Sequence, residues 1–148
     1  MKHITAVVLA IFSLPAFAAS QCDDNKTIYY GMNIKHTKEV QVCDLGSKIS
    51  YQFGPVGNKP EIMLVKNKSD VTKSVLHGSD YREEMLYIPN GVFTYAVGYA
   101  YSADKNLDEY TINVFKGDAQ ATMPKAIIKI DKNTGYNRIS NSDIPNFN

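Results

Sequence analysis

The sequence predicts an all-β protein, either an antiparallel β-sandwich or a partly open barrel. Short apolar segments recur at regular spacing, and several alternate between apolar and polar residues, which is the pattern of strands with one buried face. Glycine, proline and asparagine separate these segments, as expected for turns. Beyond the N-terminal region, no segment has the apolar periodicity of an amphipathic helix.

The first eighteen residues have the layout of an export signal. Lys2 supplies a positive start, 4–14 is apolar, and Ala16 and Ala18 are small residues at the positions that a signal peptidase reads. The apolar run of about eleven residues is too short for a permanent membrane span, so we expect no stable membrane insertion. We predict a signal peptide at 1–18 and cleavage near Ala18.

The rest of the chain, 19–148, has the length of one domain and can bury a substantial core. The bacterial character of the leader predicts a periplasmic location. Cys22 and Cys43 are the two cysteines, and an even number in an oxidising compartment predicts one disulfide. This bond would tie the start of the mature chain to the body of the domain.

The expected strands follow in order along the chain. In 48–53, Ile49, Tyr51 and Phe53 alternate with polar residues, so this strand is expected to have one buried face. The apolar run 61–66 fits a strand buried on both sides, and 141–148 reads as a polar tail. Pro89-Asn90-Gly91 predicts a tight turn between two long strands. The segments with strand character are 26–34, 39–45, 48–53, 61–66, 71–76, 83–88, 92–101, 110–116, 125–131 and 136–140. Some of them are weak, so we expect about eight to nine strands.

The strand 93–101 has a bulky face and a small face. The bulky residues are Phe93, Tyr95, Val97, Tyr99 and Tyr101, and threonine, alanine and glycine stand between them. One interpretation places the bulky face in the core and lets a second layer approach the small face. The alternative is that Tyr99 and Tyr101 emerge on a binding surface, since tyrosines are frequent at interfaces.

Charge and motifs argue against several functions. Sixteen lysines and arginines balance fifteen acidic residues, and no basic run is present, so a nucleic-acid partner is not expected. His77, Ser79 and Asp80 are triad residue types, but neighbours in one turn cannot easily form the relay. Adjacent strand residues Glu83 and Glu84 point to opposite faces. We therefore expect no enzyme, no metal and no cofactor.

The polar segment 77–84 is the strongest candidate for binding. It reads as a charged loop that interrupts the β framework, with Tyr81 and Arg82 at its centre. Tyrosine and arginine dominate the energetic centres of protein interfaces, and arginine binds carboxylates through two parallel hydrogen bonds. The alternative is a solvated turn in which Arg82 pairs with Glu83 or Glu84.

Three segments in order give the chain a partial resemblance to known proteins. They are VCDLGSKISYQFG (42–54), KPEIML (59–64) and IPNGVFTYAV (88–97). The arrangement resembles small exported bacterial β-proteins and is broadly similar to periplasmic lysozyme inhibitors and periplasmic immunity proteins. Lysozyme inhibitors carry a Ser-Gly-x-x-Tyr loop, and the nearest segment here, Gly78-Ser79-Asp80-Tyr81, has serine and glycine reversed and a different spacing.

The resemblance implies a periplasmic protein that inhibits or neutralises a cell-wall hydrolase or a secreted toxin. The expected partner-binding residues are His77, Ser79, Asp80, Tyr81, Arg82, Tyr99 and Tyr101. Two alternatives stay open: a small-ligand carrier whose tyrosine-rich strand lines a pocket between sheets, and an envelope structural or assembly module with an exposed edge strand. The sequence leaves the oligomeric state open.

Overall fold

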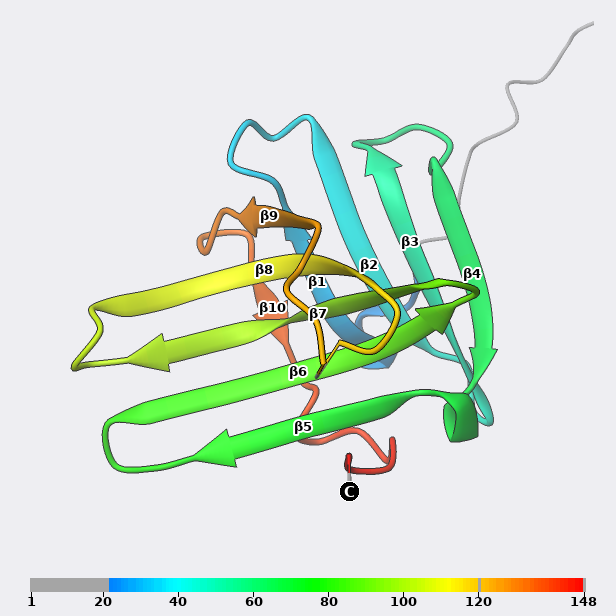
Figure 1. Cartoon of the computed structure of the whole chain (residues 1–148). Coiled ribbons are helices and arrows are strands. Elements are labelled where there is room, and N and C mark those ends of the chain that lie inside the picture. The colour runs from blue at the N-terminus through cyan, green and yellow to red at the C-terminus, as the bar shows by residue number, and fades with distance from the viewer. Residues whose placement is uncertain (1–21, 120, 148) are drawn as a thin grey trace, which may run out of the picture.

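Ten β-strands form two antiparallel sheets in the computed structural model, which describes residues 22–119 and 121–147 (Figure 1). The first sheet has the order β10-β1-β2-β3-β4, and the second has the order β5-β6-β7-β8-β9. The strands are β1 (Thr27–Met32), β2 (Lys38–Asp44), β3 (Lys48–Pro55), β4 (Ile62–Asn67), β5 (Thr72–His77), β6 (Tyr81–Asn90), β7 (Phe93–Ser102), β8 (Leu107–Lys116), β9 (Ala126–Ile130) and β10 (Tyr136–Asn137).

The expected all-β class is confirmed, and the two separate sheets make the fold a β-sandwich rather than a closed barrel. Two short 3-10 turns complete the elements, η1 (Asp24–Lys26) and η2 (Lys68–Asp70). The strands of the second sheet cross those of the first at a steep angle in Figure 1. Within residues 22–119 and 121–147, no helix is long and apolar enough to span a membrane. The predicted signal peptide, 1–18, lies outside the described residues.

The core lies between the inner faces of the two sheets. Tyr29, Tyr51 and Leu86 are among its largest buried side chains, and Tyr51 stacks on Tyr95 across the sandwich with ring centroids 5.3 Å apart. The Tyr29 hydroxyl donates to the carbonyl oxygens of the second sheet at Gly98 (3.0 Å) and Thr111 (3.3 Å). The tyrosines therefore fill the interior and also join the two layers.

The predicted hairpin around Pro89-Asn90-Gly91 is confirmed. Strands β6 and β7 pair over ten residues each, with Asn90 opposite Phe93. Gly91 has φ +60°, the left-handed conformation that glycine adopts at low cost. The strands continue closer to the turn than the sequence indicated, since Pro89 and Asn90 still belong to β6.

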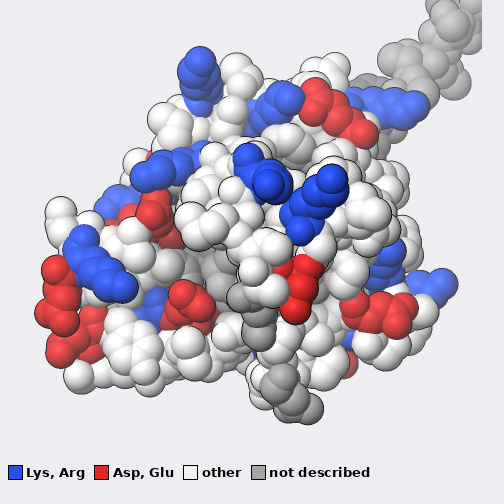
Figure 2. Space-filling view, in the orientation of Figure 1, with Lys and Arg blue, Asp and Glu red and all other residues white. Residues whose placement is uncertain are grey.

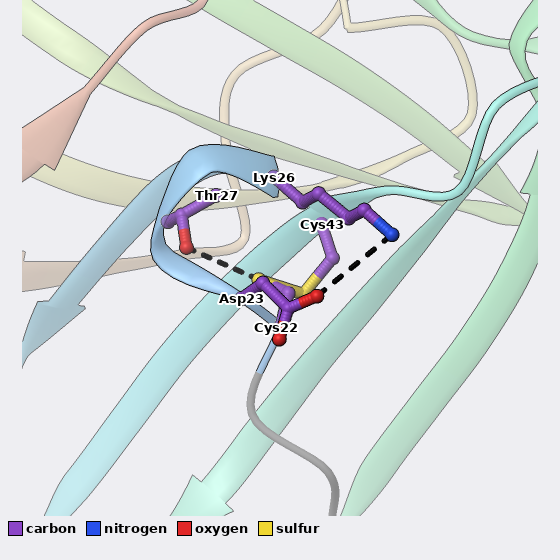
Figure 3. Close-up of a disulfide and its surroundings, with 5 residues drawn as sticks. All are labelled: Cys22, Asp23, Lys26, Thr27 and Cys43. Carbon is purple, nitrogen blue, oxygen red and sulfur yellow. Dashed lines mark hydrogen bonds and ion pairs between the residues drawn. A yellow bond between two sulfur atoms is a disulfide. The ribbon is translucent and has the colours of Figure 1, made fainter.

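The disulfide between Cys22 and Cys43 is confirmed, with 5.7 Å between the two Cα atoms. Figure 3 shows how it fastens the chain ahead of β1 to strand β2. Thr27 Oγ1 lies 3.1 Å from Cys22 Sγ, and Lys26 forms an ion pair with Asp23 at 3.8 Å. The first described residues are thus held by a covalent bond and by local polar contacts.

The prediction that 61–66 is buried on both sides was wrong. Strand β4 is the last strand of the first sheet, and its residues alternate between half-buried and exposed. Met63 and Val65 point outward with 58% and 51% of their surface exposed. A continuous apolar run cannot by itself distinguish a central strand from an edge strand with apolar residues on its open face.

The prediction of a polar tail at 141–148 was also wrong for the described part. Ile144 is 2% exposed, and Asn146 forms a parallel bridge with Lys73 of β5. Lys73 donates from its ammonium group to the Ser142 carbonyl at 2.6 Å and from its backbone amide to the Pro145 carbonyl at 2.9 Å, and its own carbonyl accepts from the Phe147 amide at 2.7 Å. A buried lysine thus anchors a segment that is polar in composition.

Candidate functional site

One end of the second sheet extends beyond the first sheet, and we call it the projecting end. Strands β6, β7 and β8 have ten residues each, while β1 to β4 have six to eight. Figure 1 shows the hairpins β5–β6 and β7–β8 running past the first sheet on the left. The projecting end comprises 76–82 and 101–108, which include the turns of both hairpins.

The segment 77–84 is not a loop, which corrects the sequence prediction. His77 is the last residue of β5, Tyr81 is the first of β6, and only 78–80 lie between the strands. His77 stands opposite Arg82, and the Gly78 amide donates to the Tyr81 carbonyl at 2.9 Å. Polar side chains are compatible with strands here because one face is solvated and the other supplies hydrogen-bond partners.

A buried carboxylate, Glu84, organises the base of the projecting end. Its side chain is fully buried, and the Oε1 atom accepts from His77 Nε2 (2.9 Å) and from Nε (2.7 Å) and Nη2 of Arg82. The Oε2 atom accepts from Asn137 Nδ2 at 2.8 Å and from the Ser140 amide at 3.4 Å. The acid therefore joins β5 and β6 to β10 and to the segment that follows it.

The surroundings of Glu84 favour its ionised form. Burial is the largest single influence and raises the pKa, but the hydrogen bonds from Arg82 and His77 and the charge of Arg82 together hold the pKa below its ordinary value. The side chains of Arg82 and His77 are each 49% exposed. These contacts are thus buried at the acid and open to solvent at Arg82 and His77.

Aromatic residues continue this surface across β7 and β8. The Tyr99 ring lies against Tyr110, with centroids 4.7 Å apart, and the Tyr99 hydroxyl donates to Asp108 Oδ1 at 3.1 Å. Lys132 donates to the other oxygen of Asp108 at 2.7 Å, and this hydrogen bond is the first cause of the lowered pKa of Asp108. Tyr101, opposite Arg82, is 41% exposed.

The structure brings together four of the seven expected partner-binding residues. His77, Arg82, Tyr99 and Tyr101 share the inner face of the second sheet, since they alternate in phase with core residues such as Val97. Tyr81 points to the outer face and is 50% exposed. Ser79 and Asp80 form the turn itself, where the Ser79 hydroxyl donates to Asp80 Oδ2 at 3.2 Å.

Pairing within the chain also changes the role expected of Arg82. Its Nε and Nη2 atoms already bind Glu84, so the two-bond fork is used inside the protein. This is the alternative in which Arg82 pairs with Glu83 or Glu84, and the partner is Glu84. Glu83 points to the other face, as the alternation in β6 predicted.

The catalytic residue types of the turn do not form a relay with one another. The Ser79 hydroxyl donates to Asp80, whereas His77 faces Glu84. Among residues 22–119 and 121–147, no group of three or more histidines, cysteines and acids is placed to hold a metal. Figure 2 shows acidic and basic side chains interspersed over the visible face rather than separated into fields of one sign.

The small face of β7 forms a shallow hollow on the outside of the second sheet. A Cβ atom on Gly98 would lie 2.1 Å from the Glu84 carbonyl oxygen, so glycine is required for this close approach. Met85, Ala96 and Phe115 form a small outer cluster, on which Ala119 packs from the β8–β9 loop. Phe147 of the C-terminal segment packs on Tyr87 of the same cluster, with ring centroids 6.1 Å apart, and the hollow that remains measures about 300 Å³.

Sequence reasoning named Glu84 only as a possible partner of Arg82 and missed its buried, organising position, and it missed Asn137 altogether. The signal for Glu84 was present, because the acid stands in phase with the buried Leu86 and Ile88 on β6. Asn137 is 53 residues away in sequence, and no local pattern indicated that it would reach Glu84.

Comparison with protein-family models, curated proteins and solved structures found no match to this chain.

Proposed function

We propose that this protein binds an enzyme through the inner face of its projecting end and thereby inhibits or neutralises it. The partner class is a cell-wall hydrolase or a secreted toxin. This class rests on the resemblance drawn from the sequence, and the geometry of the projecting end supports the mode of binding.

The observation that carries the proposal is that Glu84 anchors Arg82 beside the partly exposed Tyr101. Buried Glu84 fixes the Arg82 guanidinium through two of its nitrogens, and Tyr101 lies opposite on the neighbouring strand. Both side chains remain partly exposed. An arginine side chain that is ordered before binding loses little conformational entropy when a partner docks, and arginine and tyrosine are the residue types that dominate interface energetics.

The compartment that we propose is the periplasm, reached through the predicted signal peptide at 1–18. The disulfide between Cys22 and Cys43 suits an oxidising compartment. Balanced charge suits a partner recognised by shape and a few anchors rather than by a strong field.

The test measures the activity of purified cell-wall hydrolases and secreted toxins in the presence of the disulfide-intact protein. We expect one enzyme to lose activity at equimolar protein. Tyr101→Ala should weaken that inhibition about 30-fold, the effect of a 2 kcal/mol anchor. Tyr136→Ala is the matched control, because Tyr136 is 39% exposed but belongs to the first sheet.

Two results would contradict the proposal. One is full activity of every enzyme in the panel, and the other is inhibition by Tyr101→Ala as strong as that by the unaltered protein. Tyr81→Ala adds a comparison between the two faces of the projecting end. We expect it to weaken inhibition less than Tyr101→Ala does, because Tyr81 points to the outer face.

The ligand-carrier alternative has less support from the geometry. It requires the tyrosines of β7 to line a pocket between the sheets. Instead Tyr95 stacks on Tyr51, and Tyr99 packs on Tyr110, so these rings fill the space with one another. The assembly alternative depends on an open sheet edge, which β4 provides.

A further inference from the structure

Strand β4 is an edge strand, and none of the residues in 22–119 and 121–147 forms a backbone hydrogen bond with its outer edge. In the antiparallel ladder with β3, the Lys68 amide donates to the Ser47 carbonyl at 3.0 Å. Because hydrogen-bonding direction alternates along a strand, the backbone groups of Ile62, Leu64 and Lys66 point to β3. The amides and carbonyls of Met63, Val65 and Asn67 therefore point away from the sheet, toward solvent.

The other sheet edges of the described chain are less open. Strand β10 has two residues, and β5 is partly covered by the C-terminal segment, which bonds to both the amide and the carbonyl of Lys73. Strand β9 carries Lys129 on its outer face, in an ion pair with Glu109. On β4, by contrast, the outer face is apolar, with Met63 and Val65 more than half exposed.

We infer that β4 pairs antiparallel with β4 of a second copy of this chain, so that the two first sheets join into one continuous sheet. A twofold axis at Leu64 sets Met63 opposite Val65 of the second copy, and Val65 opposite its Met63. The outward backbone groups of these residues then bond in pairs. The same axis gathers four exposed apolar side chains on one face of the joined sheet.

The exposed apolar side chains of β4 favour this register. Lys66 points inward, a feature that discourages indiscriminate pairing at a sheet edge. With the axis at Leu64, Lys66 stands opposite Ile62 of the second copy, so no like charges face each other. An axis at Val65 would instead place Met63 opposite Asn67 and lose the apolar match. A second copy is therefore the occupant that this edge fits.

The test is sedimentation equilibrium of the purified, disulfide-intact protein over a wide concentration range. We expect the average mass to rise from that of one chain toward that of two. Val65→Lys should raise the dissociation constant about tenfold or more, because it places a charge in the apolar cluster. Met63→Pro should have a similar effect by removing an outward amide that β3 does not use.

Ile127→Lys is the matched control, since Ile127 is 57% exposed on β9, an edge strand of the other sheet. It should leave the dissociation constant unchanged. Circular dichroism at low concentration verifies that each variant is folded. The inference is overturned by a monomer at every concentration or by a dimer that both β4 variants leave intact. It is also overturned if Ile127→Lys raises the dissociation constant as much as the β4 variants do. Tyr101→Ala should dimerise normally, because the projecting end and β4 lie on opposite sides of the molecule (Figure 1).

Discussion

Replacement of Glu84 by glutamine tests whether this acid holds the projecting end to the rest of the fold. The two oxygens of Glu84 accept five hydrogen bonds, three at Oε1 from His77 and Arg82 and two at Oε2 from Asn137 and Ser140. Glutamine has nearly the same shape but offers one oxygen and one NH₂ group. However it is turned, its NH₂ faces at least two donors.

The cost of this change follows from burial and charge. Removing one partner of a buried ion pair typically costs about 3–5 kcal/mol. Arg82 and His77 are half exposed and can recover hydration, so we expect the lower value, about 3 kcal/mol in the free energy of unfolding. For a domain of this size the melting temperature should fall by about 10 °C.

Urea denaturation at pH 7, with the disulfide intact, measures the change. Glu83→Gln is the matched control, because Glu83 is adjacent in β6 but points to the outer face, and it should change stability by less than about 0.5 kcal/mol. If Glu84→Gln cost less than about 1 kcal/mol, the value of a surface ion pair, the reasoning would be refuted.

The pH dependence of the same pair of proteins gives an independent check. The pKa of Glu84 is lowered in the folded state from its ordinary value of 4.5, so ionised Glu84 stabilises the fold above that pH. This contribution is lost as the pH falls below 4.5 and through the folded pKa. The difference in stability between the unaltered protein and Glu84→Gln should therefore shrink in acid, and a constant difference would contradict the assignment.

Three further predictions concern contacts that hold the fold together. Reduction of the Cys22–Cys43 disulfide should lower the free energy of unfolding by about 3 kcal/mol, measured by urea denaturation with and without reductant, because it opens a loop with a sequence separation of 21. Gly98→Ala should cost about 3 kcal/mol or prevent folding, since the added carbon would lie 2.1 Å from the Glu84 carbonyl; a variant of normal melting temperature would argue against this packing. Tyr29→Phe should cost about 1 kcal/mol in the same urea assay, because it leaves carbonyls of the second sheet without their hydroxyl donor, and an unchanged midpoint would contradict that role.

Local chemistry explains why much of the fold was predictable. Alternation on 48–53 and the turn at Gly91 are short-range patterns, and the structure confirms both the strand and the hairpin. The even cysteine count led to the Cys22–Cys43 bond for the same reason, because only one pairing within the chain exists. Such features depend on residues that are close in sequence or have no competing partner.

Long-range contacts explain what was missed. The polar side chains of 77–84 predict a loop, yet Asn137 and Ser140 supply the partners that let Glu84 be buried in a strand. The composition of 141–148 predicts a polar tail, although Lys73 holds this segment through bonds to Ser142, Pro145 and Phe147. Both errors concern polar groups whose partners come from distant parts of the chain.

The edge position of β4 was missed for a related reason. A strand's place in a sheet is a property of topology, and the apolar run 61–66 fits a central strand as well as an open edge. The candidate site was likewise predictable only in part. The alternation of β7 placed Tyr99 and Tyr101 on one face, but the sequence did not indicate that Tyr81 would point away from Arg82.

Hydrogen exchange of the protein with and without its inhibited enzyme tests the central claim most directly. If the projecting end is the binding surface, backbone amides in 76–82 and 101–108 should exchange more slowly in the complex, while those of β4 should be unchanged. Protection confined to the first sheet, with the projecting end exchanging as in the free protein, would contradict the account.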